Sequence, residues 1–537
     1  MMRGASVHSV TPVQVKTMIR DGGELAFIDV REPLSYGSGH PLFAVNIPLS
    51  QLELRFARAV PRKSTRIVLT DKGERFAEAA AARLERFGYT DVAVMSGGGA
   101  AAWAATGYEL FVDQRVLVKA FSAFIEQHAQ PEFIEPEELK AKIDRGDDLI
   151  VLDARPAPEY RAGNIPGSID APGPDLLRRF DDLVPSPETL VVVNCMSRTR
   201  GILGSLSLVQ GGVPNKVVAL RNGTSGWRVA GFDLERNANR FGPDLSESAK
   251  QNAQARAARL ASAAGIAFVD GSTLVRWRRD ENRTTYVVDV REGEAFLEGH
   301  LPDSISVPGG GLIMHPEEIA STLNARLVLV DDDGVRATVT AFWLKQMGLF
   351  EVAVLRSDIG AQDLVAGDPH NPILGLDTTD AKRIGTDSLA GLLASNAAIV
   401  IDLGPSTTYK TGHIPGAYFA IRAYLADALA ALPSSPLQLV LTSPDSWLAQ
   451  FAAEEAALLV DRPIAVLDGG TSAWRAEAKP MQAGSNRMLS PEHDRLLRAH
   501  ERPGDLDANI RAYLDWETNL LTQINLDGDA PYRALTG

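Results

Sequence analysis

Four segments of this chain share one pattern, an apolar strand that ends in aspartate and leads into an aromatic residue and a glycine-containing turn. A second apolar strand ends 40 to 42 residues after each aspartate. In three of the repeats a glycine-rich turn with a tryptophan follows, at Trp103, Trp227 and Trp474. The four aspartates are Asp29, Asp153, Asp289 and Asp402. Because a period of this kind marks repeated supersecondary units, the chain must fold as an array of similar modules.

Strands that alternate with helical stretches indicate a parallel sheet flanked by helices. The sequence therefore predicts an α/β protein of four tandem domains, each with its own parallel sheet. We expect these domains at residues 1–115, 130–240, 264–370 and 380–482, followed by a helical C-terminal tail at 485–537. Alanine-rich stretches at Val116–Gln130 and Ser246–Ala264 read as linker helices. The tail matches no repeat, and it either packs across the domains or mediates association, for example as a homodimer.

The chain has one cysteine, Cys195, which follows the buried-strand pattern Val191 to Val193 and precedes a helix expected from Gly201. With no second thiol, an intrachain disulfide and a cysteine-cluster metal site are excluded. The loop between a strand end and a helix N-terminus offers free backbone N–H groups at the positive end of the helix dipole. Arg198 and Arg200 add positive charge, so the loop predicts a lowered thiol pKa and a reactive thiolate. The alternative is an inert cysteine that fills the core.

The other three repeats lack sulfur at the corresponding strand end. We assign the cysteine position to Thr70 in the first domain, Asp331 in the third and Thr442 in the fourth. None of these side chains offers the thiolate nucleophile of the second repeat. Domains one, three and four are therefore predicted to be catalytically inactive.

These motifs resemble the rhodanese (sulfurtransferase) family. The resemblance rests on the Asp-Val-Arg strand end, the Gly-His-Ile-Pro-Gly-Ala turn at 412–417, the cysteine loop and the closing glycine-rich turn with its tryptophan. The family's loop is Cys-x-x-Gly-x-Arg, and here Arg200 matches the final arginine while Arg198 replaces the glycine. Two-domain enzymes of this family often pair an inactive first module with an active second one, as domains one and two do here.

The resemblance implies a double displacement in which the Cys195 thiolate takes the outer sulfur of a donor such as thiosulfate. Backbone N–H groups of the loop would cradle the persulfide, and Arg200 would brace the loop or contact the donor, while Arg198 would face the pocket mouth. Glu159 stands where thiosulfate enzymes of the family often place an arginine, which leaves 3-mercaptopyruvate as an alternative donor. The substrate-binding residues are thus Met196, Ser197, Arg198, Thr199 and Arg200. With no resolving thiol in the chain, the acceptor comes from outside, as cyanide, a small thiol or an acceptor protein.

Two other functions compete with this interpretation. Related phosphatases use Cys-x5-Arg, whereas the spacing from Cys195 to Arg200 is Cys-x4-Arg, which suits sulfur better than phosphate. Three inactive modules also fit a non-catalytic sulfur carrier or interaction scaffold. The net charge of −14 argues against nucleic-acid and anionic-membrane partners, and no apolar leader or membrane span is visible. We expect a cytoplasmic protein without a cofactor or metal.

Overall fold

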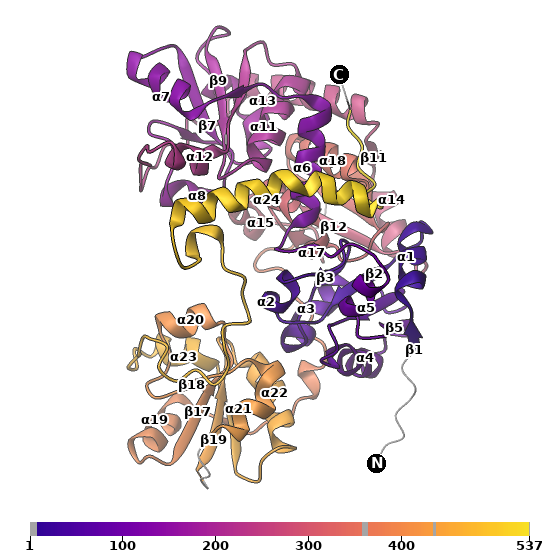
Figure 1. Cartoon of the computed structure of the whole chain (residues 1–537), viewed down its shortest axis with the longest axis vertical. Helices are drawn as coiled ribbons and strands as arrows, with labels where there is room; N and C mark the ends of the chain where they lie inside the picture. Colours follow the sequence, from indigo (N-terminus) through magenta and orange to yellow (C-terminus); the bar gives the residue numbers. More distant parts are fainter. Residues whose placement is uncertain (1–7, 357–363, 433–436, 536–537) are drawn as a thin grey trace.

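The structure is a computed structural model that describes residues 8–356, 364–432 and 437–535. Each repeat folds into a five-stranded sheet flanked by helices, and all strand pairs are parallel (Figure 1). The predicted α/β fold with four tandem modules is therefore confirmed. The sheet of the first module has the strand order β1 (His8–Val10), β5 (Val92–Met95), β4 (Ile67–Thr70), β2 (Ala26–Asp29), β3 (Val45–Asn46), and that of the second has β6 (Phe133–Ile134), β10 (Val217–Leu220), β9 (Leu190–Asn194), β7 (Leu149–Asp153), β8 (Ile169–Asp170). The order in the third module is β11 (Ala267–Val269), β15 (Glu351–Leu355), β14 (Arg326–Val330), β12 (Thr285–Asp289), β13 (Ile305–Ser306). The order in the fourth module is β16 (Arg383–Ile384), β20 (Ile464–Leu467), β19 (Gln438–Thr442), β17 (Ala398–Asp402), β18 (Tyr418–Phe419).

Helices connect the strands within each module, so the connections are crossovers between parallel strands, some adjacent in the sheet and some not. In the first two modules the helices are α1 (Pro12–Arg20), α2 (Pro33–Gly37), α3 (Leu52–Ala59), α4 (Phe76–Arg86), α5 (Ala100–Ala105), α7 (Pro136–Arg145), α8 (Ala157–Ala162), α9 (Asp175–Arg178), α10 (Phe180–Leu183), α11 (Thr199–Gly211) and α12 (Gly223–Val229). In the last two they are α14 (Gly271–Arg278), α15 (Gly293–Glu298), α16 (Gly309–Met314), α17 (Pro316–Ile319), α18 (Val335–Met347), α19 (Thr386–Ala394), α20 (Ser406–Thr411), α21 (Leu425–Ala430), α22 (Trp447–Ala457) and α23 (Gly470–Ala476).

The strand register corrects two of the sequence-based equivalences. Each aspartate strand pairs in the same way with its neighbour, aligning Asp29 with Thr70, Asp153 with Asn194, Asp289 with Val330 and Asp402 with Thr442. Cys195 comes one residue after Asn194, so its counterparts are Asp71, Asp331 and Ser443. The assignment of Asp331 holds, whereas Thr70 and Thr442 are each one residue too early.

The physical reason is a difference in loop length. Helix α11 starts four residues after Cys195, but α4 starts five residues after Asp71. When the first repeat is aligned with the second on its Gly-x-Arg motif, the extra loop residue places Thr70, and not Asp71, opposite Cys195. In the fourth repeat that motif is missing, and β19 continues to Thr442, whose carbonyl accepts a ladder hydrogen bond from Leu403.

Two linker helices, α6 (Val116–Ala129) and α13 (Glu247–Ala264), form where alanine-rich stretches predict them. One hydrophobic core runs through the first three modules and includes Phe121 of α6 and Trp343 of α18. The fourth module has separate cores of its own. The first three modules thus form one packed body, to which the fourth is joined.

The C-terminal tail crosses back from the fourth module to this body (Figure 1). Its long helix α24 (Leu506–Asp527) packs against α6, and it buries Leu520 and Ile524 in the shared core. Lys16 of α1 forms an ion pair of 2.7 Å with Asp527 at the end of α24. The tail therefore packs across the domains of its own chain. Among the described residues no helix is both long and apolar enough to span a membrane.

Candidate active site in the second module

Cys195 lies directly beyond the carboxyl end of β9, a central strand whose residues Val191 to Val193 are fully buried. The residue is 3% exposed, and its side chain points to the start of α11, where the Gly201 backbone N–H donates a hydrogen bond to the sulfur. In parallel α/β sheets ligands bind at this edge of the sheet. The predicted strand, loop and helix around the thiol are therefore present.

The same contact recurs in all four modules and supports the corrected equivalences. A backbone N–H six residues further along donates to the side chain at the Cys195 position, from Ala77 to Asp71 (3.1 Å), from Ala337 to Asp331 (3.0 Å) and from Ala449 to Ser443 (3.4 Å). Each loop therefore directs this side chain at the N-terminus of the following helix. Only in the second module is the atom at this point a sulfur.

The glycine-rich turn before α12 fixes the cysteine loop from the other side. The Cys195 carbonyl accepts a hydrogen bond of 2.8 Å from Thr224 N–H, and the Met196 carbonyl accepts one of 2.9 Å from Ser225 N–H. Gly223 has a φ of 55°, and a Cβ there would lie 2.3 Å from the Cys195 carbonyl oxygen. Glycine is required at this position, since any side chain would displace the loop.

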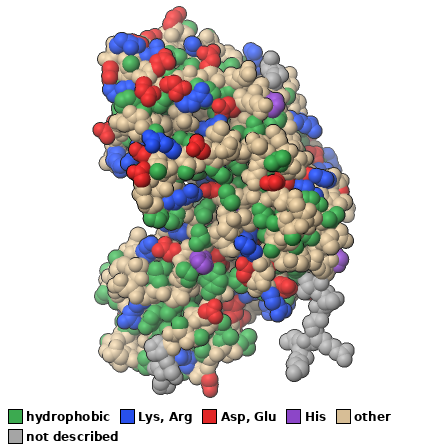
Figure 2. Space-filling model, viewed as in Figure 1, with side chains coloured by type: hydrophobic (Ala, Val, Ile, Leu, Met, Phe, Trp, Pro, Cys, Tyr) green, Lys and Arg blue, Asp and Glu red, His purple; other side chains and the backbone are tan. Residues whose placement is uncertain are grey.

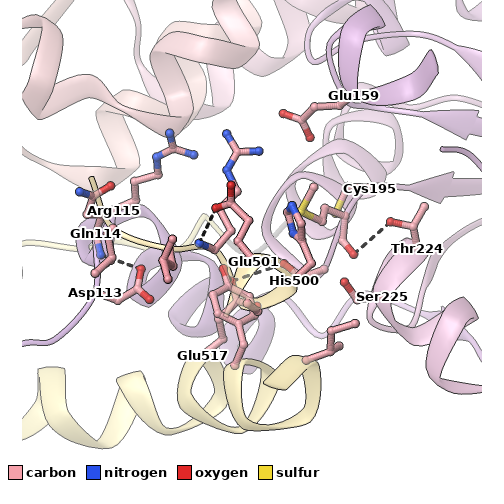
Figure 3. Close-up of a pocket in the computed structure, with 18 of the residues that line it drawn as sticks. Asp113, Gln114, Arg115, Glu159, Cys195, Thr224, Ser225, His500, Glu501 and Glu517 are labelled. Atoms are coloured by element: carbon pink, nitrogen blue, oxygen red, sulfur yellow. Dashed lines mark hydrogen bonds between the residues drawn. The ribbon is translucent and has the colours of Figure 1, made fainter. Parts of the chain in front are cut away.

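A cavity of about 800 Å³ opens at the thiol (Figure 3). Of the predicted substrate-binding residues, Met196, Ser197, Thr199 and Arg200 line it together with Cys195. The side chain of Arg198 does not. It forms an ion pair with Glu126 of α6 and donates a hydrogen bond of 2.7 Å to Thr518 Oγ1 of α24. The prediction that Arg198 faces the pocket mouth is therefore wrong, because the linker helix and the tail bind its guanidinium.

Two arginines near the thiol are neutralised by carboxylates. Arg155 forms the predicted ion pair with Asp153, at 2.7 Å and with both side chains buried. Arg200 donates two hydrogen bonds to Glu159 of α8, at 3.1 and 2.7 Å. Neither guanidinium therefore acts on the sulfur as an unbalanced positive charge.

Burial raises the pKa of the Cys195 thiol above its ordinary value. Arg200, the Gly201 N–H and Arg155 act in the opposite direction, while the nearby Asp153 adds to the rise. The prediction of a lowered thiol pKa is wrong for this site without substrate. The reason is that burial of the thiol outweighs the opposing effects of Arg200, the Gly201 N–H and Arg155.

The cavity walls include segments that sequence reasoning missed. Residues 113–115 and Lys119 come from the start of the first linker, Thr407 from the fourth module, and residues 494–501 and part of α24 from the tail. On α24, the buried Glu517 accepts hydrogen bonds from Tyr513 Oη at 2.8 Å and from Ser197 Oγ at 3.4 Å. No local pattern signals these contacts, since the tail matches no repeat and its packing partner is distant in sequence.

Outside this cavity, the carboxylates of Asp331, Asp332 and Asp333 lie within 4.8 Å of one another, which is close enough to share a cation. Backbone N–H groups of Gly334 and Ala337 already bind Asp331. Arg178 forms an ion pair of 2.5 Å with Asp333, and Arg336 one of 3.4 Å with Asp332. The cluster is thus neutralised by protein groups.

The fold and site define a class of α/β modules that hold a nucleophile loop at the carboxyl end of a central parallel strand. A family model described as a rhodanese-like domain matches residues 11–106, 135–230, 272–361 and 386–477. The chain therefore belongs to the rhodanese family, as its sequence motifs predict.

Among solved structures, the thiosulfate sulfurtransferase from Pseudomonas aeruginosa is 40% identical to this chain, with a TM-score of 0.95 over 98% of this chain and 100% of that one. A possible tyrosine phosphatase from Rhodopseudomonas palustris is 23% identical over 20% of this chain and 90% of its own, with a TM-score of 0.18. An anaerobic ergothioneine biosynthesis enzyme from Chlorobium limicola is 16% identical over 66% and 99%, also with a TM-score of 0.18. A search of curated proteins gave no match. The family and the first of these structures support a sulfurtransferase at the family level.

Proposed function

We propose that this chain transfers sulfane sulfur from thiosulfate, through a persulfide on Cys195, to a thiol or to cyanide. The observation that carries the proposal is the position of the Cys195 sulfur. It lies against the Gly201 N–H at the edge of an open cavity, where the other three modules have oxygen side chains. The likeness to a thiosulfate sulfurtransferase over nearly the whole chain supports thiosulfate as the donor.

In the first half-reaction the Cys195 thiolate attacks the outer sulfur of thiosulfate. A sulfur–sulfur bond forms at the enzyme, the sulfur–sulfur bond of the donor breaks, and sulfite leaves with the bonding electron pair. In the second half-reaction cyanide or an acceptor thiolate attacks the outer sulfur of the persulfide. Thiocyanate or a persulfide of the acceptor then leaves, and the Cys195 thiolate is restored.

The loop residues have distinct roles in this scheme. Backbone N–H groups between Met196 and Arg200 stabilise the charge on the persulfide, because the loop ends at the N-terminus of α11. Arg200 binds the sulfonate oxygens of the donor in exchange for Glu159, which holds it in the free site. A donor with a single carboxylate, such as 3-mercaptopyruvate, would compete less well for that guanidinium.

A sulfur carrier or interaction scaffold is the second candidate, since three modules lack the thiol. The two functions differ in turnover. A carrier would accept one sulfur on Cys195 and release it only to a specific partner, whereas an enzyme turns over with small acceptors.

Intact mass spectrometry after incubation with thiosulfate, or with 3-mercaptopyruvate, tests the donor directly. We expect one added sulfur atom with thiosulfate, its loss on addition of cyanide, and no addition in the Cys195→Ser variant. Thiocyanate release under steady state then measures turnover. If neither donor loads Cys195, or if release does not exceed that of Cys195→Ser, the enzymatic proposal is wrong.

A further inference from the structure

The cavity at Cys195 is far larger than a thiosulfate ion requires. Its volume of about 800 Å³ lies in the range of pockets that enclose drug-sized ligands. The molecule is hollowed on one face between the fourth module and the others (Figure 2). The first linker, the tail and Thr407 of the fourth module contribute to the walls beyond the cysteine loop. The space remaining beside a bound donor therefore fits an acceptor of substantial size.

Most of the positively charged side chains around this space are already paired with carboxylates, and a few are not. Seven arginine and lysine side chains line the cavity, and five of them have a carboxylate within 4 Å. Besides Arg155 and Arg200, these are Lys119 with Asp113 (3.5 Å), Arg228 with Asp507 (3.9 Å) and Arg495 with Glu501 (2.7 Å). Within the part of the chain that the structure describes, the remaining two, Arg115 and Arg498, have no such partner.

Of these two, Arg115 is the better placed to bind an anion. Arg498 is exposed on the tail, where solvent screens its charge, whereas Arg115 is half-buried at the N-terminal end of α6. Figure 3 shows Arg115 on the opposite side of the cavity from Cys195. Arg115 is therefore placed to contact the end of a bound molecule that lies away from the Cys195 sulfur.

The acidic groups around Arg115 leave its guanidinium available. Asp113, on the same segment, contacts Lys119 and accepts a hydrogen bond of 3.0 Å from Arg502. On α17, the Glu318 carboxylate lies 3.5 Å from His315 Nδ1, and the charges of Arg115 and Arg55 also help to lower its pKa. Burial raises the pKa of the adjacent Glu317 to about 8, so that carboxyl is mostly uncharged at neutral pH. Glu318 therefore balances part of the charge of Arg115 from a distance, but no carboxylate of the described residues forms an ion pair with its guanidinium.

We propose that Arg115 determines acceptor specificity by binding the carboxylate of an anionic, low-molecular-weight thiol whose sulfur reaches the Cys195 persulfide. The proposal rests on the proposed sulfur transfer and specifies the chemical class of its acceptor. Arg115 is a positioning residue on the acceptor side, because the donor half-reaction takes place at the other side of the cavity.

The test compares two acceptors with the same thiol, glutathione and its diethyl ester, in which both carboxylates are masked as neutral esters, with thiosulfate as donor. In the wild-type enzyme we expect a higher kcat/KM for glutathione than for the ester. Arg115→Gln should lower that preference by about tenfold or more, through KM rather than kcat, which is the scale of a hydrogen bond between charged groups. Arg115→Lys should restore part of it. Arg228→Gln removes a paired arginine from the same cavity and should leave the preference unchanged.

Two measurements distinguish a failure of this proposal from a failure of the proposed function. Persulfide formation from thiosulfate and turnover with cyanide should be the same in Arg115→Gln as in the wild type, and this also shows that the variant is folded. If the wild type does not prefer glutathione, or if Arg115→Gln and Arg228→Gln change the preference equally, the role of Arg115 is wrong. If Cys195 takes no sulfur even in the wild type, the sulfur-transfer proposal fails instead.

Discussion

Arg200 and Glu159 form a doubly hydrogen-bonded ion pair, with Nη1–Oε1 and Nη2–Oε2 distances of 3.1 and 2.7 Å, between the first turn of α11 and α8. The pair has a direct effect on the nucleophile. Arg200 is the group that most favours the Cys195 thiolate, although burial outweighs it and raises the thiol pKa. Because Glu159 pairs with Arg200, we expect this carboxylate to limit the effect of Arg200 on the sulfur.

Replacing Glu159 with glutamine should make Cys195 more reactive. The substitution keeps the shape of the side chain but removes its charge, so Arg200 acts on the sulfur without compensation and the thiol pKa falls. We expect alkylation by iodoacetamide at pH 7.5 to be roughly three- to tenfold faster. Glu501→Gln, which neutralises another carboxylate of the cavity, is the matched control. Equal rates in the wild type and Glu159→Gln would show that the ion pair does not control the thiol.

The wild-type enzyme should also show a distinct pH dependence. Because burial raises the pKa of Cys195, the thiolate is a minor species at neutral pH and its population grows as pH increases. Alkylation rates measured from pH 6 upward should rise without a plateau as far as pH 9, the ordinary thiol value. A plateau near pH 7 would mean that the free site holds a thiolate.

The two arginines of the loop should differ in their effect on donor use. Arg200 faces the cavity, so Arg200→Gln should raise the KM for thiosulfate about tenfold or more. Arg198 binds Glu126 and Thr518 instead, and Arg198→Gln should mainly weaken docking of the tail. Steady-state kinetics with varied thiosulfate and a thermal melt of each variant check both effects. A larger KM effect for Arg198→Gln would contradict the side-chain directions.

Asp71, which stands at the position of Cys195 in the first module, should stabilise the fold of that module. Its carboxylate accepts hydrogen bonds from Gly73 and Ala77, at 2.9 and 3.1 Å. Asp71→Ala leaves both N–H groups without this partner and should lower the free energy of unfolding by about 1–3 kcal/mol. Asp71→Asn keeps one acceptor oxygen and should cost less. Urea unfolding monitored by circular dichroism gives the comparison, and equal stability of Asp71→Ala and the wild type would refute this role.

Much of the architecture is predictable because the repeats are periodic. The aspartate strands end at Asp29, Asp153, Asp289 and Asp402 as the sequence predicts, and both linker helices form. Cys195 also lies where the strand and helix patterns place it. These features depend on the local sequence pattern of strands and helices, and the pattern is easy to recognise because it occurs in four repeats.

The remaining features depend on geometry that local pattern does not encode. A single extra loop residue before α4 hides the equivalence of Asp71 and Cys195, which the register of β2 with β4 and the hydrogen bond from Ala77 N–H to Asp71 show. The direction of Arg198 is set by partners on α6 and α24. The thiol pKa depends above all on burial, which follows from how the loop packs in the folded module.

The contact between Ser197 and Glu517 joins residues 320 positions apart. During synthesis, the second module emerges from the ribosome long before this tail. A growing chain can fold the second module and expose Cys195, but it lacks the wall that α24 provides. The full cavity at Cys195 therefore forms only after α24 has been synthesised and has packed against α6.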